Sequence, residues 1–120
     1  MAHSKVNTDE KFEAFMASRK AGLTVVEFGA VWCSACKSFA KHFKTLEQAY
    51  PPVAFLKLDV DRCSVTADKY QVEKMPTFVL LAEGGKVLKR LEGADPEAVR
   101  AAIDSLLLSS TAPPRAPKSA

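Results

Sequence analysis

The strongest constraint on the fold is a regular alternation, along 120 residues, of helical periodicity with short runs of β-branched and aromatic residues. Residues 24–28 and 53–60 form such apolar runs and are read as strands. Between them, apolar side chains recur at helical spacing from Phe39 to Tyr50 and stop before Pro51-Pro52. Strands that alternate with helices pair in parallel and are covered by helices on both faces of the sheet.

The other segments extend this pattern and predict the order αβαβαββα, with a weak edge strand around residues 5 and 6. They are a helix from a cap at Asn7 or Thr8 to Gly22, a short helix over 64–70, an antiparallel hairpin of 77–82 and 86–91 around Glu83-Gly84-Gly85, and a last helix that Asp95-Pro96-Glu97 begins. We therefore expect an α/β fold, a three-layer α/β/α sandwich with a mixed central sheet of four to five strands and four helices.

The chain has the length and the 48% hydrophobic share of one compact domain. We assign this domain to residues 1–108. Residues 109–120 hold three of the seven prolines and no large apolar residue, so they cannot offset the entropy of ordering. We expect them to form a disordered, Pro-rich basic tail.

Charge argues against two classes of partner. The 17 Lys and Arg against 14 Asp and Glu give a net charge of +3, and two of the excess charges, Arg115 and Lys118, lie in the tail. A domain so close to neutral is a poor partner for nucleic acid or an anionic membrane.

The sequence contains no segment of the kind that spans or crosses a membrane. No apolar run approaches the roughly 18 residues that span a bilayer, and the first twenty residues lack the apolar segment of a secretory signal. We expect a cytoplasmic monomer with neither nucleic-acid nor membrane partners.

Two of the three cysteines form the motif Cys33-Ser34-Ala35-Cys36 between the end of a strand and the start of a helix. If Cys33 caps that helix, the unpaired amides and the helix dipole favour its thiolate, the nucleophilic form. Cys36, one turn inside, should be shielded and keep its proton. Residues three apart share a helix face, so the sulfurs can form a reversible disulfide.

Two other interpretations of the pair remain open. Both thiols could be inert packing residues, although this does not explain their place at a strand-to-helix junction beside Trp32. They could also be half of a zinc site, but Cys63, His3 and His42 show no ligand spacing relative to the pair and no second CxxC exists. Redox chemistry is the favoured interpretation, with no metal and no cofactor.

Four motifs together resemble the thioredoxin family over residues from about 5 to 108. They are residues 26–37 with Trp32-Cys33-Ser34-Ala35-Cys36 at their centre, Asp59-Val60-Asp61, Met75-Pro76-Thr77, and Gly84-Gly85-Lys86-Val87. A CxxC followed about forty residues later by a Pro-Thr strand start and a Gly-rich hairpin is far more specific than CxxC alone. The resemblance implies the thioredoxin fold.

The resemblance also implies a role for each motif residue. Cys33 would be the attacking thiolate and Cys36 the resolving thiol, and Pro76 would be a cis-proline facing the disulfide. Without the resemblance Pro76 would be expected to be trans, because only about 5 to 6% of X-Pro bonds in folded proteins are cis. An apolar rim for docking partners would consist of Trp32, Ala30, Met75, Gly93 and Ala94.

Glu27 and Lys57 interrupt two neighbouring apolar strands. From the residues alone, each is expected to point to solvent. The resemblance instead implies a buried acid behind the disulfide, usually Asp, that exchanges a proton with the resolving cysteine and has a Lys partner. Burial should raise the pKa of Glu27, and Lys57 should oppose that rise.

Four positions depart from the family pattern or stand outside it. Ser34-Ala35 replaces the usual Gly-Pro, which leaves the reduction potential open. Gly29 stands where a second tryptophan is common, which opens the wall beside the site. Cys63 is expected to be a thiol with no assigned task; its alternative is a regulatory thiol for oxidation or intermolecular pairing.

The expected function is that of a thiol-disulfide oxidoreductase, a protein-disulfide reductase that acts through the Cys33-Cys36 dithiol/disulfide. By the resemblance, its substrates are protein disulfides and its electron donor is a flavoprotein disulfide reductase, which would place it in electron transport and cell redox homeostasis. The alternative is a thioredoxin-like binding module with little catalytic turnover.

Overall fold

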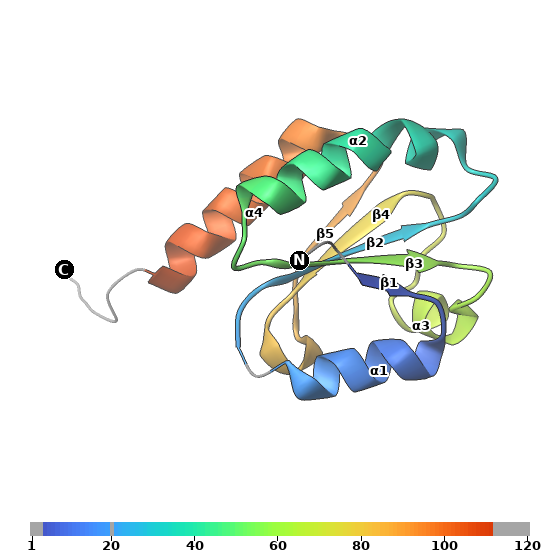
Figure 1. Cartoon of the computed structure of the whole chain (residues 1–120), viewed down its shortest axis with the longest axis horizontal. Coiled ribbons are helices and arrows are strands. Elements are labelled where there is room, and N and C mark those ends of the chain that lie inside the picture. The colour runs from blue at the N-terminus through green and yellow to red at the C-terminus, as the bar shows by residue number, and fades with distance from the viewer. Residues whose placement is uncertain (1–3, 20, 112–120) are drawn as a thin grey trace.

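A five-stranded mixed sheet forms the centre of the molecule in the computed structural model, which describes residues 4–19 and 21–111 (Figure 1). The strand order is β1 (Ser4–Val6), β3 (Ala54–Asp59), β2 (Thr24–Gly29), β4 (Thr77–Leu81) and β5 (Val87–Glu92). β1, β3 and β2 are parallel, whereas β4 is antiparallel to β2 and to β5. The predicted mixed sheet is confirmed, including its weak edge strand.

Two layers of helices cover the sheet, as Figure 1 shows. α2 (Ser34–Ala49) and α4 (Pro96–Thr111) lie on one face, and α1 (Asp9–Ser18) and α3 (Ser64–Lys69) lie on the other. This confirms the predicted three-layer sandwich with four helices. Within the described residues, no helix is both long and apolar enough to cross a bilayer.

Capping side chains fix where two helices begin. Thr8 Oγ1 accepts a hydrogen bond from the Lys11 amide at 3.0 Å, so Thr8 is the cap of α1. Asp95 Oδ1 accepts from the Glu97 and Ala98 amides at 3.1 and 3.3 Å, which confirms the predicted start of α4. At its other end α4 continues through Thr111, beyond the domain boundary expected at 108. The rest of the expected tail, residues 112–120, lies outside the described residues.

The predicted hairpin is also present. Gly84 and Gly85 have φ angles of 78° and 88°, which an L side chain rarely adopts, and they lie in a short 3-10 turn (Glu83–Gly85). This turn joins β4 to the antiparallel β5.

The side chains of β2 alternate between two hydrophobic cores, because successive strand residues point to opposite faces. Val25 packs in the core beneath α2 and α4, whereas Val26 and Phe28 pack in the core beneath α1 and α3. Glu27 has the same parity as Val25, so its carboxyl group is directed toward α2. The strand register thus places an acid beneath the helix that carries the cysteine pair.

Candidate active site

Cys33 is the N-cap of α2, as the sequence predicted. Its amide donates a hydrogen bond to the Ala30 carbonyl at 3.1 Å, which closes the turn between β2 and α2. Its Sγ accepts a hydrogen bond from the Cys36 amide at 3.1 Å. Cys33 and Cys36 are joined by a disulfide, with their Cα atoms 5.3 Å apart. A donor amide and the helix N-terminus both stabilise negative charge on the Cys33 sulfur.

The relative exposure of the two cysteines differs from the prediction. Cys33 is only 7% exposed, whereas Cys36, which was expected to be shielded, is half-buried. The reason lies in β2: an ideal Cβ on Gly29 would stand 3.1 Å from Cys36 Sγ. Any side chain at position 29 would press against one side of Cys36. Because Gly29 has no side chain, that side of Cys36 stays uncovered.

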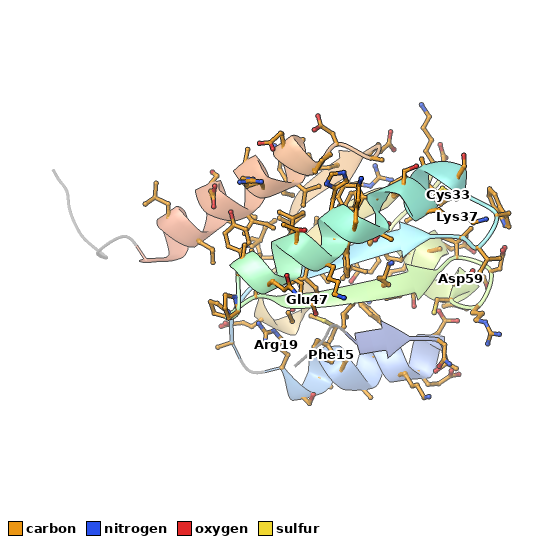
Figure 2. All side chains as sticks on the ribbon, turned by 45° about the horizontal axis from the view of Figure 1, so that its top comes forward. Phe15, Arg19, Cys33, Lys37, Glu47 and Asp59 are labelled. Atoms are coloured by element: carbon orange, nitrogen blue, oxygen red, sulfur yellow. A yellow bond between two sulfur atoms is a disulfide. The ribbon has the colours of Figure 1, made fainter. Side chains whose placement is uncertain are left out.

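A cavity of about 540 Å³ lies beside Cys36. Gly29, Ala30 and Cys36 line it, together with the exposed residues Val31 and Lys37, so it opens to solvent. Figure 2 shows Cys33, Lys37 and Asp59 at the same end of the molecule, where β3 ends and α2 begins. The glycine thus opens the wall of the site, as expected from the sequence.

Glu27 lies in the floor of this cavity and is 2% exposed. None of the described residues donates a hydrogen bond to either carboxylate oxygen. Burial raises the pKa of Glu27 to about 7, and the positive charge of Lys57 partly opposes this rise. The solvent-facing orientation expected from the residues alone is wrong for Glu27, because β2 is a central strand covered by helices on both faces.

Lys57 is the cross-strand partner of Glu27 in the parallel pair of β2 and β3. It is half-buried and lines the same cavity. Its Nζ lies 5.2 Å from the centroid of the Phe43 ring on α2, a cation–π distance. The ammonium group is therefore held between the sheet and α2, on the face that carries the disulfide.

Pro76 precedes β4, is buried, and follows a cis peptide bond from Met75, as the resemblance implied. The Gly93 amide donates to the Pro76 carbonyl at 2.9 Å. This hydrogen bond holds the loop after β5 against the cis-proline. Met75 and Gly93 are thereby brought into one loop cluster.

Most of the expected docking rim is accessible. Trp32 is 62% exposed and donates from Nε1 to Asp61 Oδ2 at 2.9 Å. Gly93 and Ala94 are exposed and Met75 is half-buried. Ala30 departs from the expectation: it is buried and lines the cavity, because the turn to Cys33 folds it inward.

Sequence reasoning missed two residues of this surface. Val31 is 73% exposed beside Trp32, and Asp61 fixes the indole of Trp32 through its hydrogen bond. An apolar residue in the turn two positions before Cys33 was an available signal for Val31. The Asp61 contact joins two loops that are distant in sequence, so nothing in the local pattern indicated it.

Cys63 is completely buried in the core beneath α1 and α3. Its Sγ donates to the Val6 carbonyl at 3.5 Å, and burial raises the pKa of its thiol. A regulatory thiol needs thiolate character and access to solvent. The structure therefore favours a packing role over the regulatory alternative.

Comparison with known proteins decides the family. The thioredoxin family model matches residues 3–105. The chain belongs to the thioredoxin family. It is 41% identical to thioredoxin H2-1 of Oryza sativa subsp. japonica over 109 residues, which are 91% of this chain and 77% of that protein. It is 37% identical to thioredoxin-2 of Saccharomyces cerevisiae over 102 residues, covering 85% and 96% of the two chains.

Solved thioredoxins have the same fold. The thioredoxin of Schistosoma mansoni superposes with a TM-score of 0.81 at 34% identity, over 87% of this chain and 94% of that one. The thioredoxin of Fasciola hepatica gives 0.79 at 36% identity, over 84% and 96%.

Family and geometry together give the activity. Thioredoxins are protein-disulfide oxidoreductases, and this member carries a Trp32-Cys33-Ser34-Ala35-Cys36 motif whose cysteines are disulfide-bonded at the start of a helix. The chain is a thiol-disulfide oxidoreductase with Cys33-Cys36 as its redox centre. A bonded pair in this family and setting supports the redox interpretation over the inert packing pair considered from the sequence.

Proposed function

We propose that the chain works in the reducing direction and that Cys33 is the attacking nucleophile. The observation that carries this assignment is the hydrogen bond of 3.1 Å from the Cys36 amide to Cys33 Sγ at the N-terminus of α2. That donor and the helix dipole lower the free energy of the thiolate relative to the thiol. Cys36, inside the helix, lacks this position and serves as the resolving thiol.

The reaction then has two exchanges. Cys33 thiolate attacks a sulfur of the substrate disulfide, forms a mixed disulfide and releases the first substrate thiolate. Cys36 thiolate attacks Cys33 Sγ, restores the Cys33-Cys36 bond and releases the second substrate thiolate. Two electrons pass from the dithiol to the substrate.

Glu27 is proposed to accept the proton of Cys36 in the second exchange. Its pKa of about 7 suits proton exchange near neutral pH. An ideal Cβ on Gly29 would stand 3.8 Å from Glu27 Oε2 and 3.1 Å from Cys36 Sγ. The carboxylate and the sulfur therefore both border the space that a side chain at position 29 would fill. Lys57 acts as a positioning residue that limits the rise of the Glu27 pKa.

The rim of exposed Trp32, Gly93 and Ala94 with the half-buried Met75 is proposed to dock substrate proteins beside Pro76. Met75 would offer its backbone to an extended substrate segment, by analogy with strand addition at a sheet edge. The hydrogen bond from Trp32 to Asp61 holds the indole in one orientation before a partner arrives.

A flavoprotein disulfide reductase is proposed as the electron donor and the monomer as the working form, which makes the chain a carrier in electron transport for redox homeostasis. A catalyst that must be re-reduced works best in a reducing compartment, and we propose the cytoplasm. A solved relative, mitochondrial thioredoxin 3 of Saccharomyces cerevisiae, aligns at 34% identity with a TM-score of 0.76 over 86% of this chain and 94% of that one. Similarity to thioredoxins therefore does not by itself assign a compartment.

The test measures reduction of insulin disulfides with NADPH and a flavoprotein disulfide reductase as the electron source. The wild type should turn over, and Cys33→Ser should abolish turnover. Cys36→Ser should stop after one exchange and accumulate a mixed disulfide with the substrate, visible as a covalent adduct by mass spectrometry. Turnover by Cys33→Ser, or an adduct in that variant instead, would refute the assignment of roles.

The binding-module alternative predicts a different result. In that case the wild type and Cys33→Ser would bind partners equally well, and neither would reduce insulin. Its support is the exposed Trp32 rim, which needs no thiol to bind a partner.

A further inference from the structure

The cavity beside the disulfide gives access to only one of the two bonded cysteines. Cys36 lines the cavity, whereas Cys33 lies outside its wall and is 7% exposed. Val31, which is exposed beside Trp32, is part of the cavity wall. The proposed function uses Glu27 and Lys57 in the cavity wall, but it assigns no ligand to the open space beside Cys36.

Its size and position suit a small molecule. A volume of about 540 Å³ lies within the range of roughly 300 to 1,000 Å³ typical of small-molecule sites. It lies where β1 and β3 end and α2 begins, at the carboxyl edge where open α/β sheets bind ligands.

The charges on its wall favour an anion. Lys37, Lys57 and Arg62 contribute three positive charges. The acids are Glu27, whose burial disfavours its charged form, and Asp59, whose Oδ1 already accepts a hydrogen bond from the Asp61 amide at 2.8 Å. Three cationic side chains thus stand against two acids, one of them disfavoured in its charged form by burial, so the net charge of the wall is positive near neutral pH.

The chemistry of the pair favours attack at Cys36. In thiol-disulfide exchange the sulfur with the lower thiol pKa leaves faster. Cys33 has the helix N-cap position and the amide donor that stabilise a thiolate. A nucleophile arriving through the cavity would therefore meet Cys36 and expel Cys33, the better leaving group.

We propose that the cavity admits a small anionic thiol, which reduces the Cys33-Cys36 disulfide directly by attack on Cys36 Sγ. The thiolate forms a bond to Cys36, the bond between Cys36 and Cys33 breaks, and its electron pair stays on Cys33. A second small thiolate attacks the small-molecule sulfur of the mixed disulfide, forms the small-molecule disulfide, and releases Cys36 thiolate, which takes a proton from solvent. Two small thiols thus supply the two electrons. The inference rests on the proposed function, whose turnover produces the disulfide.

The first experiment closes the cavity. Oxidised full-length protein is mixed with 2-mercaptoethanesulfonate, and the remaining disulfide is followed by acid quench, alkylation and mass spectrometry. Gly29→Trp should slow reduction about tenfold or more, since each tenfold corresponds to about 1.4 kcal/mol of barrier. The backbone at Gly29 does not have a positive φ, so a side chain causes no backbone strain there. Its Cβ would stand 3.1 Å from Cys36 Sγ, so an unchanged urea midpoint of the variant is the control for a local distortion. Ala101→Trp, at an exposed position on α4, is the matched control and should leave the rate unchanged.

The second experiment locates the attacked sulfur. In Cys33→Ser the remaining Cys36 thiol should react with the disulfide of 2-mercaptoethanesulfonate, and adding Gly29→Trp should slow that reaction about tenfold. In Cys36→Ser the Cys33 thiol should react at a rate that Gly29→Trp changes by less than about twofold. Equal slowing of both thiols would overturn attack through the cavity.

The third experiment tests charge without filling the space. Arg62→Glu should slow reduction by 2-mercaptoethanesulfonate about fivefold, a change that corresponds to about 1 kcal/mol. It should slow reduction by 2-mercaptoethanol, whose thiolate carries one negative charge fewer, by no more than about twofold. Lys44→Glu, an exposed change of equal charge on α2 outside the cavity, should affect neither. Equal responses to both thiols would refute an anion-binding wall.

These outcomes separate this inference from the proposed function. If the cavity variants change no small-thiol rate while reductase-driven insulin reduction still depends on Cys33, only the small-thiol route is wrong. If Cys33→Ser retains insulin turnover, the assignment of roles fails whatever the cavity variants do.

Discussion

Glu27 and Lys57 face the same side of the sheet as directly paired residues of two parallel strands, beneath the helix that carries the disulfide. Their opposite charges do not cancel the effect of burial, because the pKa of Glu27 still stands at about 7. The site thus keeps an acid that is about half protonated at neutral pH, at the expense of folding stability.

This arrangement predicts a pH-dependent stability that Glu27→Gln removes. The pKa of Glu27 is 4.5 in its ordinary state and about 7 when folded, so the folded protein binds the extra proton between these values. The contribution of Glu27 to stability therefore falls as pH rises from about 4.5 to about 7 and is constant above and below this range. Glu27→Gln should raise the free energy of unfolding by about 3 kcal/mol at pH 8 and by almost nothing at pH 4.

Urea denaturation at the two pH values measures this difference. Glu73→Gln, at an exposed position, is the control and should change stability little at either pH. An equal gain from Glu27→Gln at pH 4 and pH 8 would show that the titration of Glu27 is not its cause.

The proton role of Glu27 predicts a second pH effect. The base must be ionised to accept the Cys36 proton, so resolution of the mixed disulfide should become faster as pH rises through about 7. Glu27→Gln should lose this inflection and, at pH 8, slow the step about tenfold or more. Single-turnover rates of mixed-disulfide decay give the profile. An unchanged inflection in the variant would assign the titration to another group.

The hydrogen bond from Trp32 to Asp61 predicts an energetic coupling between two loops. Trp32→Phe and Asp61→Ala should each remove the bond, and the double variant should add little to either. The coupling energy should be about 0.5 to 1.5 kcal/mol in a double-mutant cycle of unfolding. Strict additivity would show that the bond contributes nothing to the folded state.

Burial of Cys63 predicts unequal labelling of the thiols. In reduced native protein, iodoacetamide should modify Cys33 in minutes, because the start of α2 stabilises its thiolate, and leave Cys63 unmodified, whereas in urea all three cysteines should react. Cys63→Ala should lower stability by about 1 to 2 kcal/mol, because it leaves a small core cavity, and should leave insulin reduction intact. Rapid native labelling of Cys63 would restore the regulatory alternative.

Local patterns predicted most of the fold because each depends on near neighbours in the chain. The cap at Thr8, the glycines at 84 and 85 and the Asp95-Pro96 start act within a few residues of themselves, and each ends or begins an element as expected. The cysteine pair belongs to the same class. A strand followed by a helix start was enough to place Cys33 at a cap.

The sequence by itself determined the order of strands and helices, the cap position of Cys33 and, through four motifs, the family. Only the tertiary structure decided that Glu27 is buried, that Cys36 rather than Cys33 lines a cavity, and that Cys63 is sealed in the core. These properties arise where segments distant in sequence pack together, as when the missing side chain of Gly29 on β2 uncovers a sulfur on α2. Periodicity along one segment carries no information about the volume that a second segment leaves unfilled.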